Sequence, residues 1–369
     1  MSGRWPLLPR SGEFSQILET RQKDYMENNS KTNASNVIFG CSGLRLTRGE
    51  IDLFKAVKPW GLILFSRNLQ APDQVKALVG DFKDAIGRDD AIILIDQEGG
   101  RVSRLPETFW RIPPSPTIFS EIYKQNPTQA ENAVFLNYRL IAHDLKSLGI
   151  NVNCAPMLDI PRSGSAPVVT DRAFGTNPEI VTRLAEKAIQ GMKAGGVAPV
   201  IKHAPGHGRA TVDSHHLLPR VDTSNQLLAD TDYKPFIALQ NEAMLMTAHI
   251  IYSAIDPSLP GTISPIIIKD IIRSKLGFNG LIMTDDINMH ALCGPVPQRA
   301  RQALDAGCDI ILHCSGSLEE MSEISDVVSG LEGLGLNRAR AAEAQAYAKA
   351  DETDLDQIRE RLDIILHDY

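Results

Sequence analysis

Short apolar runs alternate with longer segments of helical periodicity along most of the chain from Val37 onward. Each apolar run has the length of one strand and lacks the apolar–polar alternation of a sheet with one face in water. Strands that are apolar on both faces are typical of a parallel sheet covered by helices. Eight such runs occur, at residues 37–43, 60–65, 91–96, 150–156, 197–204, 244–250, 280–286 and 308–314.

The segments between these runs carry the start and stop signals of helices. Thr47 and Glu50 have the spacing of a capping box, in which each side chain satisfies a backbone N–H group. Asn177 followed by proline predicts a helix start, and Gly195 predicts its end. A similar pattern spans residues 264–277. Eight strand–helix alternations in one order predict a single-domain α/β fold, a (β/α)8 TIM-type barrel, with a doubly wound sheet as the alternative.

The two ends of the chain differ from this pattern. Residues 1–35 show no clear period and end in a polar run, which predicts a short N-terminal extension, partly disordered, with a helical segment around residues 14–25. We therefore predict one catalytic barrel over residues 36–369. Its last part, 337–366, is rich in alanine and charge and predicts one or two exposed helices.

Composition narrows the class of protein further. The 369 residues carry a net charge of −7, which offers no basic surface for nucleic acid. No apolar run has the length of a membrane span, and the N-terminus lacks the apolar core of a secretory signal. Five widely spaced cysteines with no C-x-x-C pair predict free thiols in a reducing compartment. A cytoplasmic protein without nucleic-acid or membrane partners is expected.

Charged residues gather at the carboxyl ends of the predicted strands, where barrel enzymes place their chemistry. Asp96 ends the third run, Lys202 and His203 end the fifth, and Asp285 ends the seventh. Asp286 is adjacent to Asp285, and successive strand side chains point to opposite sides. Only one of the two is therefore expected to enter the barrel mouth.

The loop after the fifth run holds four histidines between residues 202 and 216, which first suggests a metal site. The first strand offers no ligand, however, and His207 and His215 lack the i, i+4 spacing of a metalloprotease pair. We therefore predict no metal and no other cofactor. Asp213 lies two residues before His215, where it would favour the protonated imidazole, so His215 is the candidate proton donor.

Four motifs resemble glycoside hydrolase family 3, in particular its single-domain bacterial β-N-acetylhexosaminidases. They are IDQEGGRVSRL, DRAFG, KHAPGHGRATVDSHHLLP and LIMTDDINM, and they occur in the order of that family. The resemblance implies a retaining mechanism with a covalent glycosyl-enzyme intermediate. It assigns Asp285 as nucleophile, His215 as acid/base and Asp213 as its partner. The implied sugar-binding residues are Asp96, Arg104, Arg172, Lys202 and His203.

The resemblance also implies the substrate, a small carbohydrate: N-acetylglucosamine β-1,4-linked to 1,6-anhydro-N-acetylmuramic acid, with or without its peptide, as in peptidoglycan recycling. The chain departs from the family at Ala204, where phenylalanine is common, and at Gly208-Arg209-Ala210, where Gly-Asp-Thr is frequent after the histidine. Three alternatives remain open: a metal-dependent barrel hydrolase, a phosphorolytic enzyme on the same sugars, and a sugar-binding barrel without catalysis.

Overall fold

The computed structural model describes residues 34–214 and 216–369. The predicted extension up to residue 33, including the expected helical segment, lies outside the described residues. Ala34 is fully buried and Ser35 begins the first strand, so the barrel starts within the last two residues of that extension. No helix in the described ranges has the length and apolar character that crossing a membrane requires.

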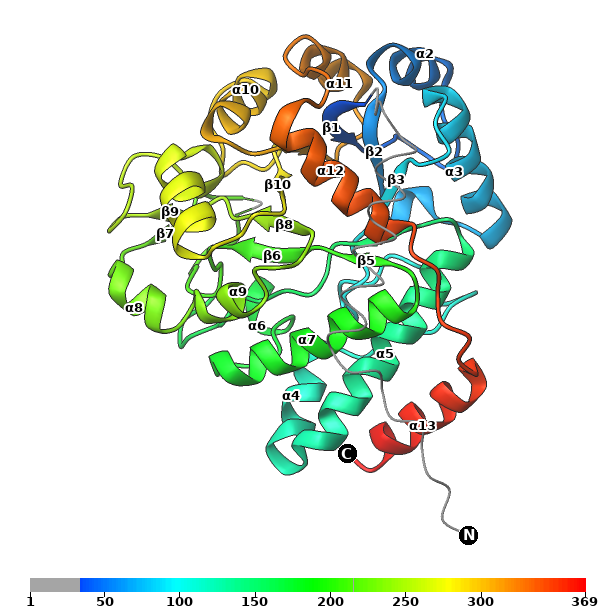
Figure 1. The fold of residues 1–369 in the computed structure, drawn as a ribbon, viewed down its shortest axis with the longest axis vertical. Helices are drawn as coiled ribbons and strands as arrows, with labels where there is room; N and C mark the ends of the chain where they lie inside the picture. The colour runs from blue at the N-terminus through cyan, green and yellow to red at the C-terminus, as the bar shows by residue number, and fades with distance from the viewer. Residues whose placement is uncertain (1–33, 215) are drawn as a thin grey trace.

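The predicted barrel is confirmed. In the described part of the chain, nine strands form one parallel sheet in the order β5-β4-β3-β2-β1-β11-β10-β8-β6 (Figure 1). Each of the eight predicted runs contains strand. The bounds are β1 Ser35–Phe39, β2 Pro59–Leu64, β3 Ile92–Ile95, β4 Val152–Asn153, β5 Ala198–Pro199, β6 Ile201–Ala204, β8 Met244–Thr247, β10 Leu281–Asp286 and β11 Ile310–His313.

The fifth predicted strand is divided into two pieces, and this division closes the ring. β5 pairs with β4, whereas β6 pairs with β8, and only Val200 separates the two pieces. The Val200 N–H group donates to the carbonyl oxygens of Asn153 and Ala155. A separate two-stranded sheet joins β7 (Arg220–Val221) to β9 (Ile251–Tyr252).

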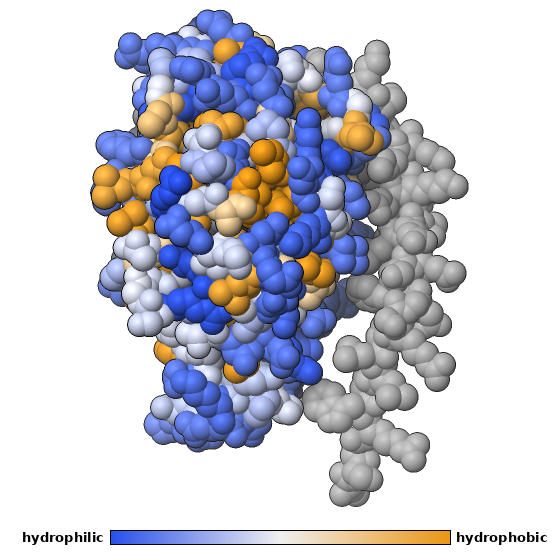
Figure 2. Space-filling model, turned by 90° about the vertical axis from the view of Figure 1, so that its left-hand side faces the viewer, coloured by the Kyte–Doolittle hydropathy of each residue, from blue (hydrophilic) through white to orange (hydrophobic). Residues whose placement is uncertain are grey.

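Alternate side chains of the strands enter two different cores. Ile92 and Leu94 of β3 belong to the cluster inside the barrel, whereas Ile93 and Ile95 pack outward among the helices. Both faces of each strand are thus removed from water, which explains runs without polar alternation. On the outside, the surface in Figure 2 is largely hydrophilic, with smaller apolar patches between charged side chains.

Helices follow the strands around the barrel (Figure 1). Thr47 and Glu50 form the predicted capping box, and the Asn177 side chain accepts hydrogen bonds at the start of α7, which Gly195 ends. The helices are α2 Arg48–Val57, η1 Ser66–Asn68, α3 Pro72–Ile86, α4 Pro116–Gln125, α5 Pro127–Ser147, α6 Pro167–Thr170, α7 Pro178–Ala194, α8 Asn225–Asp230, α9 Lys234–Ala238, η2 Gly261–Ile263, η3 Ile267–Lys275, α10 Val296–Ala306, α11 Leu318–Ser325, α12 Gly333–Ala346 and α13 Leu355–His367.

The prediction that the C-terminal helices are exposed is wrong for α12. This helix crosses the end of the barrel that faces the viewer in Figure 1, and Ala339, Ala342 and Ala346 are fully buried against the interior cluster. Alanine permits this close approach because it adds little bulk to the helix. α13 packs against α5 through Ile358 and Leu362, and its other face is largely exposed.

A buried carboxyl group ties α12 to the barrel. Trp60 Nε1 donates to Glu343 Oε1 at 2.8 Å, and Arg88 Nη2 donates to the same atom at 3.2 Å. Burial raises the pKa of Glu343 to about 7, although the Arg88 charge acts in the opposite direction.

Glu343→Gln is expected to flatten the pH dependence of stability. Because folding raises the Glu343 pKa, its stabilisation is fully present below the unfolded-state pKa and is lost as pH rises toward about 7. Between pH ~4.5 and ~7 the wild-type urea midpoint should therefore fall relative to that of Glu343→Gln. The exposed Glu107 offers a matched control, and Glu107→Gln should follow the wild type. Parallel curves for wild type and Glu343→Gln would contradict this assignment.

Candidate active site

The carboxyl ends of the strands bring most of the predicted site residues together, at the end of the barrel opposite α12. Asp96 directly follows β3, Lys202 and His203 lie in β6, and Asp285 lies in β10. Arg172 reaches the same place from the turn after α6. One pocket is lined by residues from these elements and from the loop after β6: Met157, Asp159, Val168, Val169, Arg172, His203, His207, Asp213, Ser214 and Asp285.

Lys202 and Arg172 belong to a buried network of charges beside this pocket. Lys202 Nζ lies 2.7 Å from Asp96 Oδ1 and 2.6 Å from Glu98 Oε1. Burial alone would lower the Lys202 pKa, but these two carboxylates raise it well above its ordinary value. Lys202 is therefore a permanent cation, and Asp96 is held by it at the strand end.

Arg104 lies at the edge of the same network. Its Nη2 atom is 3.8 Å from Asp96 Oδ2, and its guanidinium stacks over the Phe65 ring at 5.6 Å from the centroid. Its Nε atom is buried without a hydrogen-bond partner among the described residues. The structure thus places Arg104 beside Asp96, with a donor still unused.

Asp285 faces the pocket with one carboxylate oxygen fixed. Its Oδ1 accepts a hydrogen bond from the Asp286 backbone N–H at 2.8 Å, and its Oδ2 lies 4.0 Å from His203 Nε2. Burial would raise the pKa of Asp285, but His203, His249 and Lys202 hold it below its ordinary value. The carboxylate is therefore ionised at neutral pH, as a nucleophile must be.

The adjacent carboxyl group has a different environment, as the alternation of strand side chains predicts. Asp286 Oδ1 accepts backbone hydrogen bonds from Asn288 and Cys314, each at 3.1 Å. Burial raises its pKa. Asp286 therefore holds the ends of β10 and β11 and does not line the pocket.

Asp159 organises the floor of the site. His203 Nδ1 donates to Asp159 Oδ2 at 2.6 Å, and the His207 backbone N–H donates to Asp159 Oδ1 at 2.5 Å. Burial would raise the pKa of Asp159, but the two histidines hold it below its ordinary value. The charge of Asp159 thus orients the His203 ring, whose other nitrogen faces Asp285.

The loop after β6 brings Asp213 into the same pocket as Asp285. Next to Asp213, Ser214 Oγ lies 3.3 Å from His207 Nε2. Burial lowers the pKa of His207 to about 4, so this ring is neutral at ordinary pH. His215, the predicted acid/base, lies outside the described residues, and its pairing with Asp213 stays a prediction.

The departure from the family pattern in this loop has a structural consequence. Arg209 Nε donates to Asp232 Oδ2 at 2.8 Å, and Arg209 Nη2 donates to Thr231 Oγ1 at 3.0 Å. Gly208 leaves no room for a side chain, because a Cβ atom there would lie 2.2 Å from the Ile160 carbonyl oxygen. The loop is therefore anchored on both sides before it reaches Asp213.

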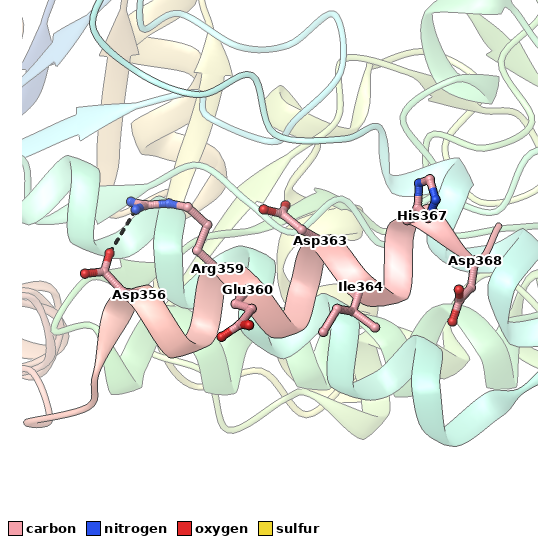
Figure 3. Close-up of a pocket in the computed structure, with 7 residues that line it drawn as sticks. All are labelled: Asp356, Arg359, Glu360, Asp363, Ile364, His367 and Asp368. Atoms are coloured by element: carbon pink, nitrogen blue, oxygen red, sulfur yellow. Dashed lines mark hydrogen bonds and ion pairs between the residues drawn. The ribbon is translucent and has the colours of Figure 1, made fainter.

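A second hollow, of about 660 Å³, lies along α13. Figure 3 shows side chains of this one helix around it, with Asp356 paired to Arg359 and the apolar Ile364 between charged neighbours. None of the predicted site residues lines it. Elsewhere, within residues 34–214 and 216–369, no three His, Cys, Asp or Glu side chains converge in the manner of metal ligands.

Sequence reasoning missed Glu98. This residue belongs to the DQEGG motif, but a glutamate in a glycine-rich turn gives no sign of its partners. In the structure it accepts hydrogen bonds from Arg172 Nε at 2.8 Å and from Arg172 Nη2 at 2.6 Å, besides its contact with Lys202. Its only sequence signal is its place two residues after Asp96.

Comparison with known proteins agrees with this site. The Glycosyl hydrolase family 3 N terminal domain matches residues 47–347. The β-hexosaminidase of Alkalilimnicola ehrlichii is 41% identical over 283 residues, which cover 76% of this chain and 80% of that protein.

Solved structures give the same result. NagZ from Neisseria gonorrhoeae, in complex with N-trifluoroacetyl-D-glucosamine, matches with a TM-score of 0.81 at 30% identity, over 91% of this chain and 98% of that one. A family 3 β-N-acetylglucosaminidase from Paenibacillus matches with a TM-score of 0.80 at 30% identity, over 89% of this chain and 66% of that one. The chain therefore belongs to glycoside hydrolase family 3. Within that family it is a glycosidase of the β-hexosaminidase group.

Proposed function

We propose that this protein is a retaining β-N-acetylglucosaminidase, with Asp285 as nucleophile and His215, assisted by Asp213, as acid/base. The observation that carries the proposal is the ionised Asp285 carboxylate, which lines one pocket together with Asp213. Retaining glycosidases need one ionised carboxylate to attack the anomeric carbon and a second group to move protons. The β-hexosaminidase relatives support the choice of sugar.

In the first step, an Asp285 oxygen forms a bond to the anomeric carbon while the bond from that carbon to the leaving oxygen breaks. His215 gives its proton to the leaving oxygen, which departs as an alcohol. The Asp286 N–H group holds the other Asp285 oxygen, so that one oxygen remains directed at the sugar. In the second step, neutral His215 takes a proton from water, whose oxygen replaces Asp285 at the anomeric carbon.

Five further residues are proposed to bind the sugar: Asp96, Arg104, Arg172, Lys202 and His203. The Asp96 carboxylate would accept hydrogen bonds from sugar hydroxyl groups, while the four nitrogen-bearing side chains would donate to others. Support comes from their gathering at the strand ends around Asp285, with Lys202, Asp96 and Arg104 already in mutual contact. Charged and planar groups of this kind fix a polar ligand in one orientation.

The proposed substrate is N-acetylglucosamine β-1,4-linked to 1,6-anhydro-N-acetylmuramic acid, with or without peptide, in cytoplasmic peptidoglycan recycling. Its support is the resemblance to the single-domain bacterial enzymes and the likeness to NagZ over nearly the whole of that chain. A reducing compartment agrees with the five cysteines, all of which are free thiols.

Hydrolysis of a chromogenic N-acetyl-β-glucosaminide is expected to exceed that of the matching β-glucoside by about a hundredfold or more in kcat/KM, because a site built to bind a polar group discriminates strongly against its absence. The anhydro disaccharide should yield free N-acetylglucosamine. A chelator and added inorganic phosphate form the control arms. Equal rates on the two chromogenic substrates would contradict the proposed specificity. Loss of activity with the chelator would instead support a metal hydrolase, and a sugar phosphate product would support phosphorolysis.

A further inference from the structure

Glu98 has no part in the two chemical steps, yet it is more deeply buried than the residues that line the pocket wall around it. Its side chain is 2% exposed, and it does not line the pocket. The Oε1 atom lies 2.6 Å from Lys202 Nζ and 2.6 Å from Arg172 Nη2, while Oε2 lies 2.8 Å from Arg172 Nε. One carboxylate oxygen therefore serves both cations at once.

The charges of this trio are mutually dependent. Arg172 and Lys202 repel each other, and the Arg172 charge acts to lower the Lys202 pKa. Burial would neutralise Glu98, but the two cations hold its pKa far below its ordinary value, and Glu98 in turn raises the pKa of Arg172 against the effect of burial. Without Glu98, two like charges would share a buried site with Asp96 as their nearest remaining carboxylate.

The hydrogen-bond inventory shows what remains for a ligand. Lys202 has three N–H donors, of which Asp96 and Glu98 use two. Arg172 has five, and Glu98 uses one on Nε and one on Nη2, while Nη1 contacts the Val168 carbonyl oxygen at 3.3 Å. Each cation thus keeps unused donors, and Glu98 determines the direction in which they point.

We propose that Glu98 is a positioning residue, which fixes Lys202 and Arg172 in the geometry that binds the sugar and does not touch the sugar itself. The inference rests on the proposed function, because it takes Lys202 and Arg172 as sugar-binding groups. It predicts an effect on sugar affinity that is transmitted through two neighbours. The reacting groups, Asp285 and His215, are not expected to change.

The test uses Glu98→Gln in the full-length protein. The amide keeps the size of the side chain but removes its charge and turns N–H donors toward other donors. The KM for the chromogenic N-acetyl-β-glucosaminide and the inhibition constant of free N-acetylglucosamine should rise together, by about tenfold or more, since bonds between charged groups are lost. Covalent labelling of Asp285 at saturating donor should still reach completion.

Two variants control for loss of structure. Glu98→Asp keeps the charge but is one methylene shorter, so its two constants should lie between those of wild type and Glu98→Gln. Glu343→Gln removes another buried carboxylate paired with an arginine, at the opposite end of the barrel, and should leave both constants unchanged. If Glu98→Gln does not fold, Glu98→Asp alone decides the question, and wild-type constants in that variant would overturn the proposal.

A folded Glu98→Gln variant with wild-type KM and inhibition constant would likewise overturn it. An equal loss in labelling of Asp285 would also count against it, because that result would place Glu98 in the chemistry. Failure of the proposed function would appear differently, in the wild-type protein. A wild type that neither hydrolyses the glucosaminide nor binds N-acetylglucosamine would overturn both.

Discussion

Replacing Asp285 by alanine is expected to reduce turnover by a factor on the order of 10⁴ or more, as loss of a nucleophile does in other covalent enzymes. Without the carboxylate no glycosyl-enzyme forms, and water must attack the anomeric carbon unaided. The fold should persist, because the Asp285 side chain accepts only the hydrogen bond from the Asp286 N–H among its printed contacts with the backbone. Initial rates and circular dichroism would measure the two effects separately.

Azide provides a control for the role of Asp285. In Asp285→Ala this small anion would fit the space of the missing carboxylate and attack the same face of the sugar, giving an α-glycosyl azide from an activated substrate. Asp285→Asn, which fills that space, should not be rescued. Residual activity above about a hundredth of wild type in Asp285→Ala, without azide, would show that another group attacks the sugar.

His215→Ala is expected to impair hydrolysis most strongly for substrates with poor leaving groups. The alkoxide that departs from the natural disaccharide is strongly basic and needs a proton, whereas a nitrophenolate leaves without one. Glycosylation should therefore fall by about 10²–10⁴ on the disaccharide, the usual contribution of a general acid, and much less on the nitrophenyl glycoside. With no base to activate water, the intermediate should accumulate, and rapid mixing should show a burst of nitrophenol.

Asp213→Asn tests the other half of this pair. Loss of the carboxylate removes the charge that favours protonated His215, so the basic limb of the pH–rate profile should move to lower pH. His207→Asn serves as a comparison, because His207 is neutral and contacts the loop through Ser214 only. Equal losses across leaving groups in His215→Ala, together with an unmoved basic limb in Asp213→Asn, would mean that His215 only shapes the loop.

Much of the fold could be predicted because its strands are buried on both faces. Ile92 to Ile95 supply the interior and the outer core alternately, so the run reads as continuously apolar. Local caps such as Thr47 and Asn177 also act within four residues and are visible in sequence. The burial of α12 was not predictable in this way, since alanines favour an exposed helix and a close-packed one alike.

The candidate site divides along the same line. The positions of Asp96, Lys202 and Asp285 follow from strand ends, because a parallel barrel brings those ends together. The partners of Glu98 lie 74 and 104 positions away in the chain, and no local spacing reveals such contacts. For the same reason, the hold of Asp159 on His203 and on the His207 backbone becomes visible only in three dimensions.

The most direct measurement is the mass of the protein after reaction with a 5-fluoro analogue of an activated N-acetylglucosaminyl donor. Fluorine at C5 slows both steps by destabilising positive charge in the sugar ring, while a good leaving group restores the first, so the intermediate accumulates. The proposed mechanism predicts one added glycosyl residue per chain and, after digestion, its attachment to Asp285 in the peptide that contains LIMTDD. Attachment to Asp286, or turnover with no covalent adduct, would contradict it.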